Sequence, residues 1–355
     1  MNVQLQPRAL AVPLFVAALA LGFLPGAGFF LPKLMLLAAG AVGFSLWALA
    51  RGQPAPRLPL VLALVFFGLT CSSALRDPAP GALLLDAAAA LLLIALLRLR
   101  WSGAAALRGL ALAGGLLAAV VIAQWLLPGP RLRMFGTLGN PDFCAAWLVP
   151  SFCAALPWRD RRGLVLAALQ GVALACIGSF ATVLALLAAA LLLARPRLAL
   201  GAAAAGALCL AAAGRDPVRA LEGRLYLHRI CAPHLLDAPL PGLGKGSVRA
   251  LWPRWEADRW ASGAEPETAR RFAAAQDHVH DDWLERALED GWPSALVLLL
   301  LAALSIRRAR ARPEFAAAGA GLAALAARAL VDFPLARPAE LSLFVVLLAL
   351  PYQES

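Results

Sequence analysis

Long apolar stretches recur along the chain and are separated by short polar connections. Most are continuous runs of Ala, Leu, Val, Gly and Phe, and many approach the roughly 20 residues that a helix needs to cross a bilayer core. A membrane β-barrel would instead alternate apolar and polar residues. The pattern predicts an all-α, polytopic integral membrane protein with about twelve transmembrane helices. The predicted spans are 9–27, 31–50, 58–75, 81–97, 104–127, 141–157, 164–178, 180–194, 198–213, 292–306, 316–331 and 335–351.

Basic residues are distributed unevenly between the two sides of the predicted membrane. With the N-terminus in the cytoplasm, the short inner segments carry fifteen arginines, whereas the short outer connections carry five Lys or Arg residues. The positive-inside rule therefore places both termini in the cytoplasm. A second interpretation treats 164–194 as one long tilted helix, which leaves eleven spans. The charge asymmetry favours two spans there, because losing one would invert half of the pattern.

One long polar segment, 214–291, interrupts the apolar pattern between the predicted helices of 1–213 and those of 292–355. The topology places this large loop outside the cytoplasm, on the periplasmic side. All four histidines of the chain lie in it: His228, His234, His278 and His280. Because ionisable chemistry is concentrated there, we expect the large loop to contain short helices and to carry the catalytic segment.

Composition and charge agree with this picture. The chain is 61% hydrophobic with a mean hydropathy of +0.75, far above the usual balance of a soluble domain. The large loop holds eleven basic and thirteen acidic residues. The net charge of +11 therefore lies mainly in the short inner segments, where it meets anionic lipid. We expect contact with membrane lipid and no nucleic-acid partner.

The connection between the fifth and sixth predicted spans is the first candidate for chemistry. Arg131 and Arg133 lie at the outer membrane surface, against the general charge asymmetry, which favours contact with an anion. The dipeptide Asn140-Pro141 is typical of a turn that opens a helix. A plain connecting turn is the alternative interpretation.

The start of the large loop is the second candidate. Arg224 and His228 are spaced as on one face of a helix lying along the membrane surface. The glycines that follow, Gly242 and Gly244, indicate a tight structural turn. A phosphate-binding P-loop needs Ser or Thr directly after Gly-Lys, and here Gly246 intervenes. We therefore predict no nucleotide site.

The end of the large loop is the third candidate. Asp277 can cap a short helix whose first turn holds Asp281 and Asp282 and which ends at Gly291. His280, at the start of that helix, is a candidate general base, because imidazole changes charge near neutral pH. Two other interpretations stay open: a four-histidine zinc site, whose spacing matches no known motif, and histidines that merely lie on a surface.

Other side chains matter less to the prediction. Within or beside the spans, Arg328 and Asp332 are four residues apart and can pair on one helix face, and Asp86 lies near a span end. An ion-coupled transporter would usually need more such residues. Four tryptophans of the loop are expected mainly to anchor it at the membrane interface: Trp252, Trp255, Trp260 and Trp283.

These segments resemble the superfamily of O-antigen ligases and O-antigen polymerases, bacterial membrane glycosyltransferases. The similarity runs from about residue 131 to the C-terminus. Arg133 with 136–143 is similar to the family's Arg…Gly-Thr-Phe-Gly-Asn-Pro-Asn motif, and Arg224 with 239–244 is similar to its Arg…Pro-Leu-x-Gly-x-Gly motif. Residues 280–291 are similar to its His-Asn-x-Tyr-Leu…Glu-x-Gly block, and 331–335 to its Asp-Phe before the last span.

The chain departs from the family pattern at two positions. Phe180 follows Ser179 where the family usually has Ser-Arg, so one expected arginine is missing, and Asp281 stands where the family has Asn. The resemblance implies transfer of a glycan from undecaprenyl diphosphate to an acceptor hydroxyl at the outer face of the bacterial inner membrane. The acceptor would be lipid A core or another lipid-linked glycan, and the reaction would need neither a metal nor another cofactor.

The resemblance also implies roles for residues. His280 would deprotonate the acceptor for inverting attack on the anomeric carbon. The donor diphosphate would be bound by guanidinium groups, which are Arg133 and Arg224 together with Arg229 or Arg131. The supporting residues would be Asn140, Asp281, Glu289, His278 and Asp332. Rival hypotheses are a polysaccharide or lipid transporter and a non-catalytic membrane partner.

Overall fold

The computed structural model describes residues 7–22, 29–76, 80–127, 136–158, 160–193, 201 and 216–354, and all regular structure within them is helical. The prediction of an all-α protein is confirmed. The helices before the large loop are α1 (Pro7–Leu21), α2 (Phe30–Arg51), α3 (Arg57–Ala74), α4 (Pro80–Arg98), α5 (Gly103–Leu126), α6 (Pro141–Ala155), α7 (Arg161–Ile177) and α8 (Phe180–Leu192). Those after it are α13 (Trp292–Arg310), η4 (Pro313–Phe315), α14 (Ala316–Arg328), η5 (Pro334–Ala336), α15 (Pro338–Ala349) and η6 (Leu350–Tyr352).

Three helical segments of the described chain are long and apolar enough to cross a membrane: Phe30–Arg51, Gly103–Leu126 and Asp282–Arg310. Shorter apolar helices accompany them, such as Leu10–Leu21 and Pro338–Tyr352. Large apolar side chains stay exposed on several of these helices, as expected where a helix contacts lipid. The chain therefore has membrane character, although the number of full-length spans seen here is smaller than the twelve predicted.

The segment 164–194 forms two helices. Helix α7 ends at Gly178, whose φ of +55° is the left-handed conformation of a helix C-cap, and α8 begins at Phe180. The backbone N–H of Gly178 donates to the carbonyl of Leu174 at 3.2 Å. The prediction of two separate helices is confirmed, whereas the predicted span 198–213 lies, apart from residue 201, outside the described residues.

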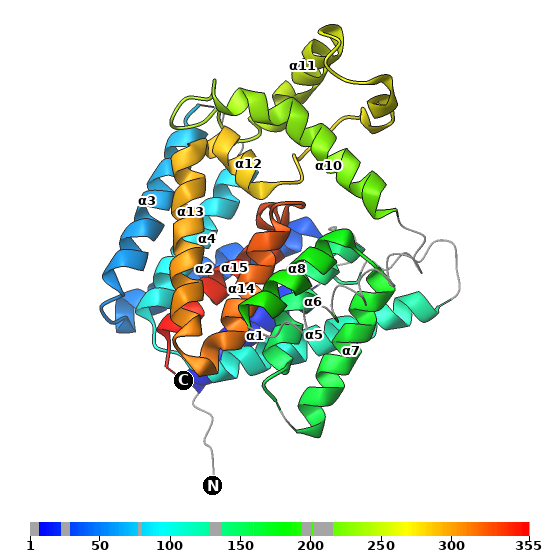
Figure 1. The fold of residues 1–355 in the computed structure, drawn as a ribbon. Coiled ribbons are helices and arrows are strands. Elements are labelled where there is room, and N and C mark those ends of the chain that lie inside the picture. Colours follow the sequence, from blue (N-terminus) through cyan, green and yellow to red (C-terminus); the bar gives the residue numbers. More distant parts are fainter. Residues whose placement is uncertain are drawn as a thin grey trace.

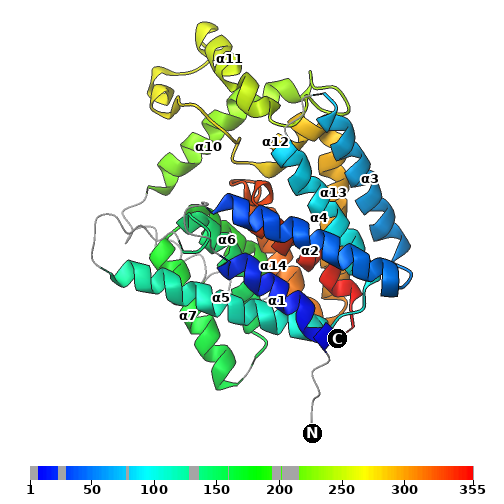
Figure 2. The same ribbon diagram turned by 180° about the vertical axis from the view of Figure 1, so that it is seen from behind.

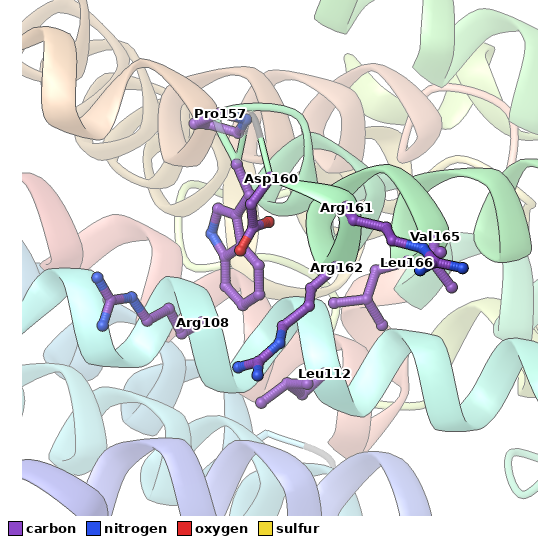
Figure 3. Close-up of a pocket in the computed structure, with 9 residues that line it drawn as sticks. Arg108, Leu112, Pro157, Asp160, Arg161, Arg162, Val165 and Leu166 are labelled. Atoms are coloured by element: carbon purple, nitrogen blue, oxygen red, sulfur yellow. The ribbon is translucent and has the colours of Figure 1, made fainter.

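The described part of the large loop, with α10 (Pro217–Cys231), η1 (Ala232–Leu235), α11 (Ser247–Ala261) and η2 (Glu267–Phe272), lies over one end of the helical body. The start of α1 and the last described residues lie at the other end (Figure 1), and the view from behind agrees (Figure 2). Near the chain ends, α5 and α7 border a groove that holds several arginines (Figure 3). The loop then re-enters the body through α12 (Asp282–Arg286) and a single π-helical turn, η3 (Ala287–Gly291), which leads directly into α13.

The large loop has an apolar core of its own. Tyr226 and Trp252 are fully buried in it, and Trp255 is nearly so. The indole N–H of Trp252 donates to the carbonyl of Ala274 at 2.9 Å. The expectation that these tryptophans anchor the loop at the membrane interface is wrong for Trp252 and Trp255, because both pack inside the loop instead. Trp283 likewise turns toward the body, where its indole donates to the Ala326 carbonyl at 3.0 Å.

Candidate functional site

Asp332 is the centre of a cluster where the large loop meets the helical body. It follows α14 by one turn, and its carboxylate accepts hydrogen bonds from Arg328 at 2.6 Å (Nη2) and 3.0 Å (Nε). Both side chains are buried, so each charge depends on the other for compensation. The predicted pairing of these two residues is confirmed.

The turn between α5 and α6 reaches the same cluster. Asn140 caps α6 by accepting from the backbone N–H of Asp142 at 2.8 Å, so its role is structural. Asp142 Oδ1 lies 3.6 Å from Arg328 Nη2. The next residue, Phe143, packs edge-on against Phe333 with ring centroids 5.6 Å apart. Arg131 and Arg133, which precede this turn, lie outside the described residues.

His280 lies on the loop side of the cluster. Its Nδ1 is 3.7 Å from Asp332 Oδ1, a charge contact that is too long for a hydrogen bond, and its side chain is 30% exposed. Among the described residues, His280 alone has positive φ without being glycine, at +57°. Such strain persists only where the surroundings impose it, and it concentrates at functional sites.

The charge state of Asp332 follows from these neighbours. Burial penalises the carboxylate, but Arg328 and His280 outweigh that penalty and hold the pKa of Asp332 well below its usual range. Asp332 is therefore negative at any physiological pH. It can orient the imidazole of His280 and stabilise its protonated form.

A second histidine packs beside the first. The rings of His278 and Phe333 stack at 4.4 Å, and the His280 ring meets the edge of Phe333 at 4.8 Å. His278 Nδ1 lies 2.8 Å from Glu285 Oε1. Burial opposes protonation of His278, but the hydrogen bond and charge of Glu285 outweigh it and raise the histidine pKa.

The cap of α12 differs from the prediction. Asp281 is the N-cap residue, accepting from the backbone N–H groups of Trp283 and Leu284, whereas Asp277 is exposed and paired with Arg249. His280 therefore precedes the helix and does not lie on one of its faces. The other oxygen of Asp281 lies 3.3 Å from His228 Nε2, so the cap also connects α12 to α10.

Arg224 reaches the cluster from α10. Its Nε donates to the carbonyl of Val331, next to Asp332, at 3.2 Å. Its terminal nitrogens have no partner among the described residues, so they are free to bind an anion. Arg224 and His280, 56 positions apart in sequence, thus contact adjacent residues.

Arg229 is engaged elsewhere. Its guanidinium group forms a bidentate ion pair with the carboxylate of Glu265. That carboxylate also accepts a hydrogen bond from Arg259 Nε at 2.9 Å. Burial of the Glu265 carboxylate disfavours its charge, but the two arginines outweigh this and lower its pKa. The structure therefore does not bring Arg229, predicted to bind the donor diphosphate, to the Asp332 cluster; its side chain is paired within the loop.

The glycine turn fastens the loop to the body. Gly242 (φ +80°) and Gly244 (φ +105°) adopt conformations that favour glycine, and a Cβ at Gly242 would lie 2.1 Å from the carbonyl oxygen of Glu289. That oxygen accepts from Gly244 N–H at 3.0 Å and from Ser73 Oγ at 2.7 Å. The side chain of Glu289 accepts from the backbone N–H of Val248 at 3.2 Å. Glu289 thus supports the turn.

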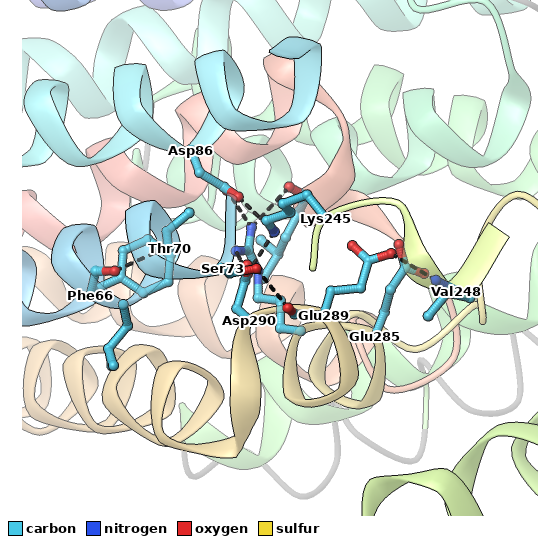
Figure 4. Close-up of polar contacts among 12 residues, drawn as sticks. Phe66, Thr70, Ser73, Asp86, Lys245, Val248, Glu285, Glu289 and Asp290 are labelled. Carbon is cyan, nitrogen blue, oxygen red and sulfur yellow. Dashed lines mark hydrogen bonds and ion pairs between the residues drawn. The ribbon is translucent and has the colours of Figure 1, made fainter. Parts of the chain in front are cut away.

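A buried charge network lies directly under this turn (Figure 4). Lys245 Nζ lies 2.8 Å from Asp86 Oδ2 and 2.6 Å from Asp290 Oδ2, and Arg286 Nη2 lies 2.8 Å from Asp86 Oδ1. Burial would lower the pKa of Lys245, but the two carboxylates raise it above its usual value. Asp86 stands out in the sequence as a lone acid at the end of an apolar run, a pattern that indicates a buried cation partner but does not identify Lys245 or Arg286.

A cavity of about 320 Å³ opens beside the network. His278, Lys245 and Arg286 line it, and so does Arg337, which the sequence analysis treated only as a topology signal. The guanidinium carbon of Arg337 lies 4.2 Å from the ring centroid of Phe143, and Arg337 has no ion pair with a described residue. Nowhere in the described chain do three or more His, Cys, Asp or Glu side chains form a group that could hold a metal ion.

Comparison with known proteins adds no assignment to this geometry, because no protein-family model and no curated protein sequence matches the chain.

Proposed function

We propose that the chain is a metal-independent, inverting membrane glycosyltransferase of the O-antigen ligase or polymerase type. It would transfer a glycan from undecaprenyl diphosphate to an acceptor hydroxyl at the periplasmic face of the bacterial inner membrane, with about twelve spans and the large loop outside the cytoplasm. One observation carries the proposal. His280, Asp332 and Arg224, from three of the resemblance segments, lie together where the loop meets the body.

The reaction assigns His280 the role of general base. The acceptor oxygen attacks the anomeric carbon from the face opposite the diphosphate, its proton passes to the imidazole, and the bond between the anomeric carbon and the diphosphate oxygen breaks. The electron pair leaves with undecaprenyl diphosphate, and the anomeric configuration inverts. Asp332 faces Nδ1 of His280 and stabilises the imidazolium that forms.

The leaving group departs with negative charge, so it needs cations more than a general acid. The free terminal nitrogens of Arg224 supply donors in the fork geometry that suits phosphate oxygens. Arg131 and Arg133 are further proposed ligands from the sequence. Arg337 adds a cation at the cavity beside the site and is a better candidate than Arg229, whose guanidinium group is paired with Glu265.

The direct test is transfer by the purified protein in detergent, with a lipid-linked glycan donor and lipid A core as acceptor. His280→Ala and Arg224→Ala should each lower the rate at least about 100-fold. His234→Ala is the matched control, because that ring stacks on Trp255 at 4.3 Å away from the cluster, and its rate should match wild type. Wild-type rates for both site variants would refute the proposal, and donor flipping in proteoliposomes that is unaffected by His280→Ala would favour a transporter.

The lipopolysaccharide of a deletion strain separates the two enzyme types. Core without any long chain indicates a ligase, whereas core that bears a single repeat indicates a polymerase.

A further inference from the structure

A second cavity, of about 1090 Å³, lies between α5 and α7 (Figure 3). Its lining comprises Arg108, Leu112, Pro157, Trp158, Asp160, Arg161, Arg162, Val165 and Leu166. Helix α5 begins beside the C-terminus, where the N–H of Gly103 donates to the carbonyl of Glu354 at 3.0 Å. The cavity is therefore at the end of the molecule that holds the chain ends, away from the large loop (Figure 1).

The lining of the cavity is strongly basic. Arg108, Arg161 and Arg162 are exposed, and none of them forms an ion pair with a described residue. Figure 3 shows the Arg162 side chain extending from α7 toward Leu112 on α5, the Arg108 side chain directed away from it along α5, and Arg161 pointing to the other side, near Val165. The single acid in the lining, Asp160, is used as the N-cap of α7, where it accepts from the backbone N–H of Gly163 at 2.9 Å.

The rest of the lining is apolar. Leu112 lies one turn beyond Arg108 on α5, and Val165 lies one turn beyond Arg161 on α7; these side chains are 52% and 58% exposed. The groove thus combines guanidinium groups with apolar side chains on both helices. Trp158 lines it as well, and indole rings favour the boundary between lipid headgroups and acyl chains. A soluble anion would use only the guanidinium groups, whereas an amphipathic molecule would use the apolar side chains as well.

We propose that this groove binds an anionic phospholipid. Its phosphodiester headgroup contacts Arg108 and Arg162, and its acyl chains lie along Leu112 and Val165. Basic pockets on the cytoplasmic side of membrane proteins suit such headgroups. The site is independent of the proposed glycan transfer, since it is built from different helices at the opposite end of the molecule.

The test compares lipid binding by wild type and by the double variant Arg108→Gln/Arg162→Gln. Native mass spectrometry from a neutral detergent would measure the affinity for cardiolipin, with phosphatidylcholine as the zwitterionic reference. Each arginine contributes about five-fold near an anionic headgroup, so the double variant should bind cardiolipin about 25-fold more weakly. Arg51→Gln is the matched control, because it removes one exposed arginine outside the groove, and its affinity should equal that of wild type.

Three results would overturn the proposal. The first is equal cardiolipin affinity in the double variant and wild type. The second is equal affinity of wild type for phosphatidylcholine and cardiolipin. The third is displacement of cardiolipin by inorganic phosphate at a concentration equal to that of the lipid phosphate. The last would indicate a site for free anions. Because the changed side chains are exposed, the variants should elute as folded protein in size-exclusion chromatography.

Discussion

Replacing Lys245 with methionine is the most direct test of how the loop is held. The ammonium group, whose side chain is only 7% exposed, lies 2.8 Å from Asp86 and 2.6 Å from Asp290. In the described chain, the other cation that contacts these carboxylates is Arg286, at 2.8 Å and 3.4 Å. The wild-type network therefore balances two anions against two cations.

Lys245→Met removes one cation and leaves Asp290 with only the 3.4 Å contact to Arg286. An uncompensated buried charge costs about 3–5 kcal/mol, a large part of a typical unfolding free energy of about 5–15 kcal/mol. Lys245→Met/Asp290→Asn restores one anion against one cation, so the double variant should recover most of that loss. An exposed control is Arg254→Met, whose 3.8 Å pair with Asp258 is worth less than about 1 kcal/mol.

The assay is reversible unfolding in mixed micelles, with the denaturing detergent titrated and the helical circular dichroism followed. We expect the midpoint of Lys245→Met to fall far below those of wild type and of Arg254→Met. If Lys245→Met lowers the free energy of unfolding by less than about 1 kcal/mol, or if adding Asp290→Asn lowers it further, the network does not hold the loop.

Three further predictions concern single residues. The Glu285 contact raises the pKa of His278 in the folded protein. The contact therefore stabilises the fold below the pKa that the histidine has in the unfolded chain, and this stabilisation is lost as pH rises through the pKa of the folded state. His278→Gln should accordingly lower the melting temperature more at pH 6 than at pH 8. Asp332→Asn should lower kcat about 100-fold with little change in KM, because it removes the charge that faces the imidazole; an unchanged kcat would exclude this role. Gly242→Ala should destabilise the protein by more than about 2 kcal/mol, because its Cβ would lie 2.1 Å from backbone oxygen. Gly263→Ala, with φ +68° but open space around it, should cost only about 1 kcal/mol, as measured by the same detergent titration.

The positions of the apolar helices could be predicted because apolar runs are local. The expected 31–50 is observed as Phe30–Arg51, and 180–194 as Phe180–Leu192. Even the break between α7 and α8 has a local cause, since Gly178 permits the left-handed cap. Local pattern does not decide which helix is long enough to cross the membrane, because packing and turns shorten several of them.

The candidate site could be predicted only in part. Arg328 and Asp332 pair at four-residue spacing, which sequence alone reveals. Lys245 and Asp86 are 159 positions apart, and no local signal connects them. Asp277 and Asp281 both suit a helix N-cap; Asp281 is used, and its other oxygen faces His228 on α10.

Arg224 and Arg229 do not share one face of α10. Five residues separate them, which corresponds to about 140° around a helix axis. Two side chains so far apart on one helix do not both face the same small site. The structure places Arg224 at Val331 and Arg229 at Glu265, as that geometry requires.

One short stretch, 281–291, performs both the docking and the positioning. Asp282 receives the N–H of Leu335 at 2.6 Å, and its own N–H donates to Ala329 at 2.8 Å, while Glu285 contacts His278. Farther along, Arg286 and Asp290 join the buried network. Apolar side chains would give the contact between 281–291 and the helical body comparable stability. They would not fix one register of this segment against the body, because apolar contacts are not directional. Hydrogen-bonded charges fix the register, and the general base that we propose needs a fixed register, because it must stay within about 0.5 Å of its working position. Removing one partner of a buried pair in this stretch should destabilise the protein, as for Lys245→Met, whereas replacing whole pairs by apolar side chains should impair the proposed glycan transfer more than folding.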